Sequence, residues 1–168
     1  MLNDFTRRYL LHGMEDSPIV LQHLADQATP DAWDRRPDPD RFTLREILAH
    51  MADWDAVWLE RLEIMLAPDG DDAHIPDHDP GQRALENDYA NADPATSLQG
   101  FRARRAELVN RLGNLGTDDW QRAGQHDVRG PFTVADLAVT ALGHDSYHLA
   151  QVAEWLQADR DRVGGQSA

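Results

Sequence analysis

The sequence predicts an all-α protein, a four-helix bundle with a long crossover connection between its second and third helices. Apolar residues recur at helical spacing in four separate blocks, and no alternating run of apolar and polar residues is long enough to require a strand. A long polar segment with several prolines separates the middle two blocks. The 168 residues, 41% of them hydrophobic, suit a single domain, residues 1–168, with a core of its own.

The first two blocks cover about residues 4–28 and residues 44–66. Ser17 and Pro18 interrupt the first block as an N-cap followed by a first-turn proline, so we expect a helix that is kinked or split there. The second block begins with a capping box, in which Thr43 caps the helix and Glu46 reciprocates. Its start is therefore well marked.

The third block covers about residues 94–112 and the fourth covers residues 134–156. Thr133 and Asp136 repeat the arrangement that opens the second helix, with aspartate as a shorter substitute for glutamate. A tryptophan-containing turn precedes each of these two starts, so the halves of the chain share a weak repeat, which favours two equivalent helix pairs. Residues 67–91, a segment rich in aspartate, form the predicted crossover. A connection of this length is often functional, for example as a lid.

The composition excludes several classes of function. The 16 basic and 30 acidic side chains give a formal net charge of −14, which argues against nucleic acid and anionic membranes as partners. The chain has no cysteine, which excludes disulfides, thiolate metal sites and a cysteine nucleophile. No window is apolar enough for a membrane span and the first residues make a poor signal peptide, so we expect a soluble cytoplasmic protein.

Three histidines carry the sharpest chemical signal. His144 and His148 lie four positions apart, so a helix brings both imidazoles to one face, and Gln151 falls on the same side. His50 lies inside the second predicted helix and can converge with them if the second and fourth helices pack face to face. Three nitrogens with an open fourth position are typical of a catalytic zinc-type site, and imidazole also suits nickel, iron or copper. The competing interpretation is that these are ordinary buried histidines.

The motifs around these histidines resemble the DinB/YfiT-like family of metal-dependent proteins. The resemblance covers roughly residues 17–156 and depends on RP at residues 36–37, FTLREILAH at residues 42–50 and HDSYHLAQ at residues 144–151. The family's second-helix histidine and fourth-helix His-x3-His fall on His50, His144 and His148. The resemblance implies a four-helix bundle, a divalent metal (zinc or nickel) on these residues, a small-molecule substrate and frequently a homodimer.

Characterised relatives of that family include transferases and isomerases that depend on mycothiol or bacillithiol. The resemblance therefore implies a divalent-metal-dependent enzyme, for example a small-thiol-dependent S-transferase or isomerase. Because the chain has no cysteine, the thiol of such a reaction has to arrive as a low-molecular-weight cofactor. Two alternatives stay open: a metal-dependent hydrolase, and a metal-stabilised binding or stress-response module without turnover.

Two other metal chemistries are disfavoured. The run from His144 to His148 resembles the zincin motif H-E-x-x-H, but Asp145 stands where the zincin base is glutamate and is one methylene too short. A di-iron carboxylate bundle requires Glu-x-x-His motifs, and the chain contains none.

Several polar residues near the histidines are candidates for the surroundings of the metal. Asp53 is the one serious competitor for the fourth ligand position, because Glu46 is already used by the capping box. Gln151 and Asp145 are expected to orient the imidazoles or a bound water. Tyr147, one residue from His148, is expected to point away from the metal-binding face.

The remaining candidates have weaker signals. Trp54 and Trp58 follow His50 at intervals of four, so we expect at least one of them in the core and the other in the core or beside the substrate. Three histidines in predicted loops are expected to face solvent: His74, His78 and His126. The alternative for His74 and His78 is a lid over the metal, and the alternative for His126 is a loop that brings it close to the metal site. Arginines of the third helix are favoured as a solvated face, with a substrate carboxylate as the alternative: Arg102, Arg104 and Arg105. Apolar residues off the main stripe of the second helix are expected to pack against a twofold-related copy: Val57, Ile64 and Leu66.

Overall fold

The computed structural model describes residues 2–68 and 73–165, and four long helices form a bundle within them. These helices are α1 (Asp4–Ala25), α2 (Leu44–Leu66), α4 (Pro94–Gly113) and α5 (Val134–Gly165). Both α1 and α2 pack against α4 and α5. The predicted all-α four-helix bundle is therefore confirmed.

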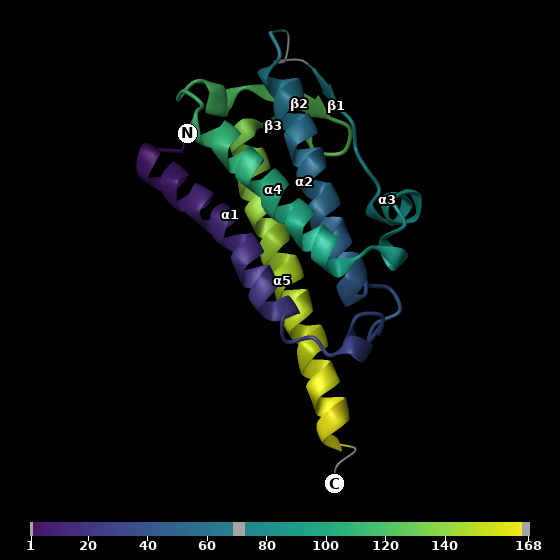
Figure 1. Ribbon diagram of the computed structural model, residues 1–168. Coiled ribbons are helices and arrows are strands. Elements are labelled where there is room, and N and C mark those ends of the chain that lie inside the picture. Colours follow the sequence, from purple (N-terminus) through teal and green to yellow (C-terminus); the bar gives the residue numbers. More distant parts are fainter. Residues whose placement is uncertain (1, 69–72, 166–168) are drawn as a thin grey trace.

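The crossover decides the direction of the helices. In Figure 1, α1 and α5 run one way through the bundle, and α2 and α4 run the opposite way. After α2 the chain returns along the side of the bundle through β1 (His74–Ile75), α3 (Pro80–Glu86) and the 3-10 helix η3 (Tyr89–Asn91). A short turn would make consecutive helices antiparallel, so the long connection is what allows the neighbours α2 and α4 to be parallel.

The starts of α2 and α5 follow the predicted caps. The Thr43 hydroxyl accepts the backbone N–H of Glu46, whose carboxylate accepts the N–H of Thr43 at 2.8 Å. Thr133 and Asp136 make the same reciprocal pair, with both distances 3.0 Å. A 3-10 helix precedes each start, η1 (Pro30–Ala32) and η4 (Asp119–Gln121), so the weak repeat of the sequence corresponds to a repeated local structure.

The first and last helices differ from the prediction in extent. α1 is one helix that contains Pro18 and ends at residue 25 instead of 28, and α5 continues to residue 165 instead of ending at 156. Pro18 lacks the N–H that would bond to the Met14 carbonyl in an unbroken helix. The Arg105 guanidinium of α4 donates to that carbonyl at 3.1 Å, which supplies the missing partner and explains why the proline is tolerated.

A small three-stranded sheet at the end of the bundle was not predicted. β2 (Ala123–His126) and β3 (Gly130–Thr133) form an antiparallel hairpin, and β1 pairs in parallel with β2. The strands have two to four residues, too few for the apolar–polar alternation by which a sequence reveals a strand. Gly124 is required here, because a Cβ would lie 2.8 Å from the Ala73 carbonyl oxygen of the neighbouring strand segment.

A layer of buried polar residues divides the core into two apolar clusters. One cluster includes Met14, Trp58 and Leu108, and the other includes Leu21 and Phe101. Each long helix carries buried polar side chains near its passage from one cluster to the other: Ser17 on α1, His50 and Asp55 on α2, Arg105 on α4, and Asp145, His148 and Gln151 on α5. Burying such groups is costly unless they are paired, so this layer is where a functional site is expected.

The second helix has less exposed apolar surface than predicted. Val57 is 1% exposed, and Ile64 and Leu66 are partly buried against the first cluster. The prediction that these residues form an exposed patch is wrong, because α4 and α5 both pack against α2. The homodimer stays a prediction, and these three residues no longer support it.

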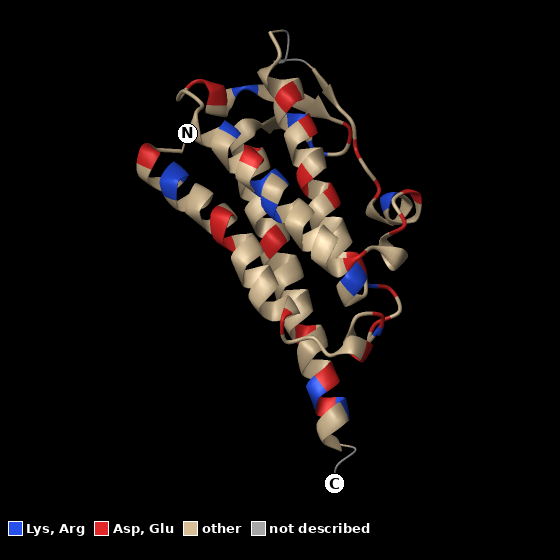
Figure 2. Cartoon of the chain, viewed as in Figure 1, with Lys and Arg blue, Asp and Glu red and all other residues tan. Residues whose placement is uncertain are grey.

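The surface agrees with the acidic composition. Figure 2 shows acidic positions spread over the four long helices and the connections between them. Of the helices in the described part of the chain, none is both long and apolar enough to cross a membrane.

Candidate metal centre

Three histidine side chains meet within the polar layer. α2 supplies His50, and α5 supplies His144 and His148 from neighbouring turns of one face. The Nε2 atoms of His50 and His144 lie 2.9 Å apart, and ligand nitrogens of all three residues lie within 4.8 Å of one another. The structure thus brings together the three histidines that the sequence singled out.

Gln151 holds His148 from the side away from the other imidazoles. Its Oε1 lies 3.1 Å from Nδ1 of His148, and its Nε2 donates to the Phe42 carbonyl oxygen at 3.3 Å. Trp155 Nε1 donates to the same carbonyl at 2.8 Å. Because an amide oxygen only accepts, Nδ1 of His148 carries the proton and Nε2 is the nitrogen with a free lone pair.

Burial keeps the three imidazoles neutral. It lowers the pKa of His50 to about 3 and the pKa of His144 to about 2. The positive charge that His148 acquires when it is protonated in acid lowers both pKa values further. Burial also lowers the pKa of His148 to about 4, against the opposing effect of the hydrogen bond to Gln151. Neutral imidazole is the form that binds a metal ion, so these side chains are prepared as ligands at neutral pH.

A pocket of about 410 Å³ lies beside the histidines. Its aromatic wall comes from three parts of the chain: Phe42, Trp54 and Tyr147. Pro80 and Gly81 at the start of α3 also line it, so the crossover contributes to the pocket, and its role as a lid stays a prediction.

The two tryptophans that follow His50 have different positions. The Trp54 ring stacks on His144, with centroids 5.9 Å apart and an interplanar angle of 16°, and lines the pocket. Trp58 is 1% exposed and packs in the core, with its ring edge-on to His144 at 6.0 Å. Both tryptophans are therefore core residues, and Trp54 also belongs to the pocket wall.

Asp53 lies on α2 near His50, but its carboxylate is bound by other residues. Arg83 donates to it through Nε and Nη2, both at 2.7 Å, and the Tyr89 hydroxyl donates at 2.6 Å. Burial by itself would raise the pKa of Asp53, but these hydrogen bonds outweigh it and lower the pKa below its ordinary value. Asp53 thus fastens α3 and η3 to α2.

Asp145 does not contact the imidazoles, so the prediction that it orients them is wrong. Consecutive helical residues point about 100° apart, which turns Asp145 from the His144 face toward α4. There the Arg105 guanidinium binds both oxygens of Asp145 and both oxygens of Asp55, the latter pair at 2.7 and 2.9 Å. Although burial lowers the pKa of Arg105, the hydrogen bond and charge of each carboxylate outweigh it and raise that pKa.

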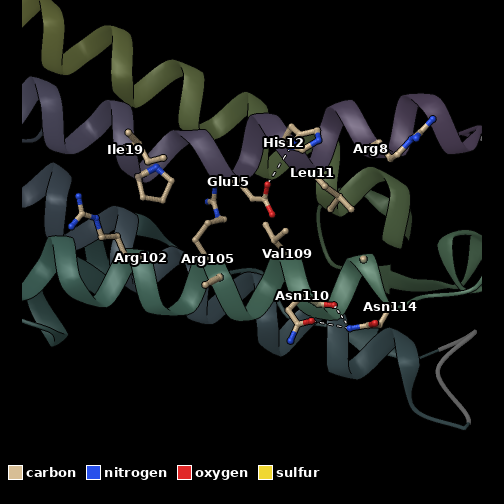
Figure 3. A pocket seen from close by; sticks show the side chains of 13 residues that line it. Arg8, Leu11, His12, Glu15, Ile19, Arg102, Arg105, Val109, Asn110 and Asn114 are labelled. Atoms are coloured by element: carbon tan, nitrogen blue, oxygen red, sulfur yellow. Dashed lines mark hydrogen bonds and ion pairs between the residues drawn. The ribbon is translucent and has the colours of Figure 1, made fainter.

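The arginines of α4 do not reach the pocket. Arg105, predicted on a solvated face, is 1% exposed, and Arg104 Nη1 donates to the Ala52 carbonyl oxygen at 2.7 Å. Arg102 lines a separate hollow of about 610 Å³ between α1 and α4. Figure 3 shows Leu11 and Glu15 of α1 extending toward Arg105 and Val109 of α4 at this hollow.

Arg41 and Tyr147 line the pocket. Arg41 is not among the residues predicted for the site, and Tyr147 is predicted to point away from the metal-binding face, so both positions are corrections. The Tyr147 ring lies 4.9 Å from that of His148, and the Arg41 guanidinium lies 5.9 Å from the Tyr147 ring centroid. Arg41 Nη1 also donates to Glu154 at 2.9 Å. A signal was present, because Arg41 lies two residues before Thr43, the N-cap of α2.

The other candidate histidines lie outside the centre. His74 is exposed in β1 and contacts Asp127 at 2.6 Å, and His78 Nε2 lies 3.5 Å from Glu60. His126 is 3% exposed, so its expected surface position is wrong. It lies at the end of β2, opposite Ile75 of β1, in a sheet that the sequence did not predict.

The donor set fits a divalent transition metal. A tetrahedral ion bound to three imidazole nitrogens at 2.0–2.1 Å would hold them about 3.3 Å apart, so the 2.9 Å His50–His144 pair has to open slightly and the wider separations, up to 4.8 Å, have to close. All three donors are neutral nitrogens, the ligand type that zinc and nickel accept. Within the described residues, the centre therefore can hold one such ion.

The fold and the sequence both have relatives. YfiT from Bacillus subtilis matches the structure with a TM-score of 0.84 over 94% of this chain and 90% of that one, at 18% sequence identity. That protein is described as a probable metal-dependent hydrolase with an unusual four-helix bundle topology. Among curated proteins, none matches this chain. The family model of the DinB superfamily matches residues 14–152, which include all three histidines, and the chain therefore belongs to the DinB superfamily.

Proposed function

We propose that this protein is a divalent-metal-dependent enzyme that acts on a small molecule beside His50, His144 and His148. The observation that carries the proposal is the convergence of three neutral imidazoles at the wall of a pocket of about 410 Å³. A purely structural site is closed by a fourth protein ligand, whereas a catalytic site leaves that position to water or substrate.

The side chains nearest to a fourth position are already in use. Asp53 is bound by Arg83 and Tyr89, and Gln151 spans His148 and the Phe42 carbonyl. The chain also has no cysteine that could close the set. When bound, the ion would act as a Lewis acid and lower the pKa of a coordinated water or thiol.

The pocket wall supports a substrate with an apolar part. Phe42, Trp54 and Tyr147 offer aromatic surface, and Trp54 is held in place by stacking on His144. Arg41 places a cation at the same wall beside Tyr147. Gln151 fixes the tautomer of His148, so that the free nitrogen faces the centre and not the protein.

Within this function we favour transfer or isomerisation that uses a low-molecular-weight thiol. A metal-held thiolate is itself the nucleophile and requires no general base. Among the described residues that line the pocket, Asp40 is the single carboxylate, and Asp53 is occupied by Arg83. Hydrolysis is the second candidate, because the structural relative YfiT is described as a probable metal-dependent hydrolase.

Cobalt substitution tests the open position directly. The cobalt protein is titrated with N-acetylcysteine, and we expect a changed visible ligand-field spectrum together with a sulfur-to-metal charge-transfer band. His74→Ala serves as the matched control and should respond like the unmodified chain, whereas His148→Ala should not bind cobalt at the site. A response to hydroxide or carboxylates but not to thiol would favour the hydrolase. A spectrum indifferent to thiol, anions and pH would show a closed site and contradict an enzymatic function.

A further inference from the structure

A second group of buried polar side chains surrounds Arg61, whose guanidinium carbon lies 5.2 Å from the Trp58 ring centroid. We propose that Arg61, with Trp58, His126 and Arg129 around it, forms a binding site for one small monovalent anion of the size of a halide, nitrate or formate. The proposal is independent of the metal centre, and no step of the proposed enzymatic function uses this site.

Arg61 is a fully buried cation with too few partners. Its residue exposure is 0%, and Nη2 donates to the Pro76 carbonyl oxygen at a long 3.3 Å. Its Nε and Nη1 are buried without a hydrogen-bond partner among the described residues. The carboxylate of Asp77 lies 4.0 Å from Nη2, beyond hydrogen-bond distance. Burial is the main cause that lowers the pKa of Arg61, but only to about 10, so the group stays charged at neutral pH.

His126 adds another unsatisfied donor. Its Nδ1 accepts the backbone N–H of Val128 at 3.2 Å, and burial followed by the charges of Arg61 and Arg129 lowers its pKa, so the ring is neutral. The proton of a neutral ring is then on Nε2. Nε2 of His126 lies 3.3 Å from Nη1 of Arg129, so two hydrogen-bond donors face each other without an acceptor between them. The nearest oxygen of the Asp77 carboxylate, Oδ1, lies 3.7 Å from Nε2.

The indole of Trp58 packs against the Arg61 guanidinium and has a buried donor of its own. The Arg61 guanidinium carbon lies 5.2 Å from the Trp58 ring centroid, and Trp58 Nε1 is buried without a partner among the described residues. Other acidic groups near the cluster have contacts of their own: Glu60 with His78 at 3.5 Å, and Asp127 with His74 at 2.6 Å. The cluster therefore has several donors and two guanidinium charges, with Asp77 as the nearest uncommitted acceptor.

An anion satisfies this arrangement better than water does. A buried water has to donate two hydrogens as well as accept, and Asp77 is the nearest group that could receive one. An anion only accepts, and it also neutralises the second guanidinium charge. Leaving buried donors unpaired costs free energy for each group, so the folded state is expected to bind whatever small anion is available. Arg61 is enclosed, with a side-chain exposure of 1%, which limits the ligand to a small one.

Bromide is the direct probe. Crystals of the full chain grown in sodium bromide should show a bromine anomalous peak within hydrogen-bond distance of Arg61 Nε or Nη1. A water molecule only at this position, with no anomalous signal, would overturn the proposal.

A solution measurement locates the same site without crystals. At constant ionic strength, replacing gluconate with bromide at about ten times its Kd should raise the melting temperature by about 3–6 °C. The rise should be lost in Arg61→Met and reduced in Arg129→Gln, whose exposed side chain can be changed without disturbing the core. Arg102→Gln, in the hollow between α1 and α4, should keep it. A rise that persists in both Arg61→Met and Arg129→Gln but vanishes in His148→Ala would assign the anion to the metal centre and reject this site.

Discussion

The Nε2 atoms of His50 and His144 lie 2.9 Å apart, although 94 positions separate the two residues in the chain. This contact requires α2 and α5 to pack with both histidines at one level of the bundle, and Gln151 sets the third imidazole beside them. In the tautomers that leave a lone pair on each of these two nitrogens, an ion between them accepts both lone pairs. The polar layer of the core is therefore arranged around this pair.

Removing any one histidine should sharply lower metal occupancy. His50→Ala, His144→Ala and His148→Ala each leave two protein nitrogens, too few for a stable zinc-type site. Elemental analysis of protein purified without a nickel column measures the occupancy and identifies the metal. His74→Ala, an exposed histidine of β1, is the control and should keep full occupancy. Full occupancy in His148→Ala would show that the ligands are different residues.

Gln151→Leu should weaken metal binding while all three ligands remain. The amide oxygen of Gln151 accepts the Nδ1 proton of His148 at 3.1 Å, and loss of such a partner typically lowers metal affinity about 10–100-fold. Competition with a chromogenic chelator measures the affinity. Gln157→Leu, exposed on the same helix, is the matched control. Equal affinities of the two variants would mean that Gln151 does not position His148.

The metal-free protein should lose stability as the pH falls below about 6.5. The pKa of His148 is lowered from 6.5 to about 4 in the folded state, so between these values the unfolded chain binds a proton that the folded chain does not. Stability is therefore present above pH 6.5 and is lost toward pH 4. For this one side chain the loss between pH 7 and pH 5 is about 2 kcal/mol.

Urea unfolding at several pH values measures this dependence. His148→Gln removes one of three titrating groups and should reduce the slope, with the contributions of His50 and His144 remaining, whereas His23→Gln, exposed on α1, should leave the slope unchanged. An unchanged slope in His148→Gln would show that His148 is not buried in the neutral form.

Arg105→Met should destabilise the fold by about 3–5 kcal/mol, because it leaves the carboxylates of Asp55 and Asp145 buried without a counter-charge. Urea denaturation measures the free energy of unfolding. Arg102→Met, exposed on the same helix, should change it little. Combining Arg105→Met with Asp55→Leu and Asp145→Leu removes all three charges and should recover most of the lost stability. If the triple variant does not recover it, packing around the guanidinium and not its charge is what stabilises this part of the bundle.

The sequence by itself determined the features that depend on neighbours within a few positions. Helical periodicity and the reciprocal pairs at Thr43 and Thr133 predicted the long helices and the starts of two of them. A spacing of four put His144 and His148 on one face, and the motif around His50 added the third histidine. These are local consequences of a turn of 3.6 residues.

Only the tertiary structure decided which partner each remaining side chain meets. Asp145 is adjacent to a histidine in sequence, yet it pairs with Arg105 because it lies about 100° round α5 from His144 and so meets the buried guanidinium in the interior of the bundle. Val57 and His126 are buried by elements distant in the chain, and the strand at Ile75 exists only because β2 lies beside it. Burial and pairing depend on contacts between segments far apart in sequence, and a pattern within one helix contains no information about them.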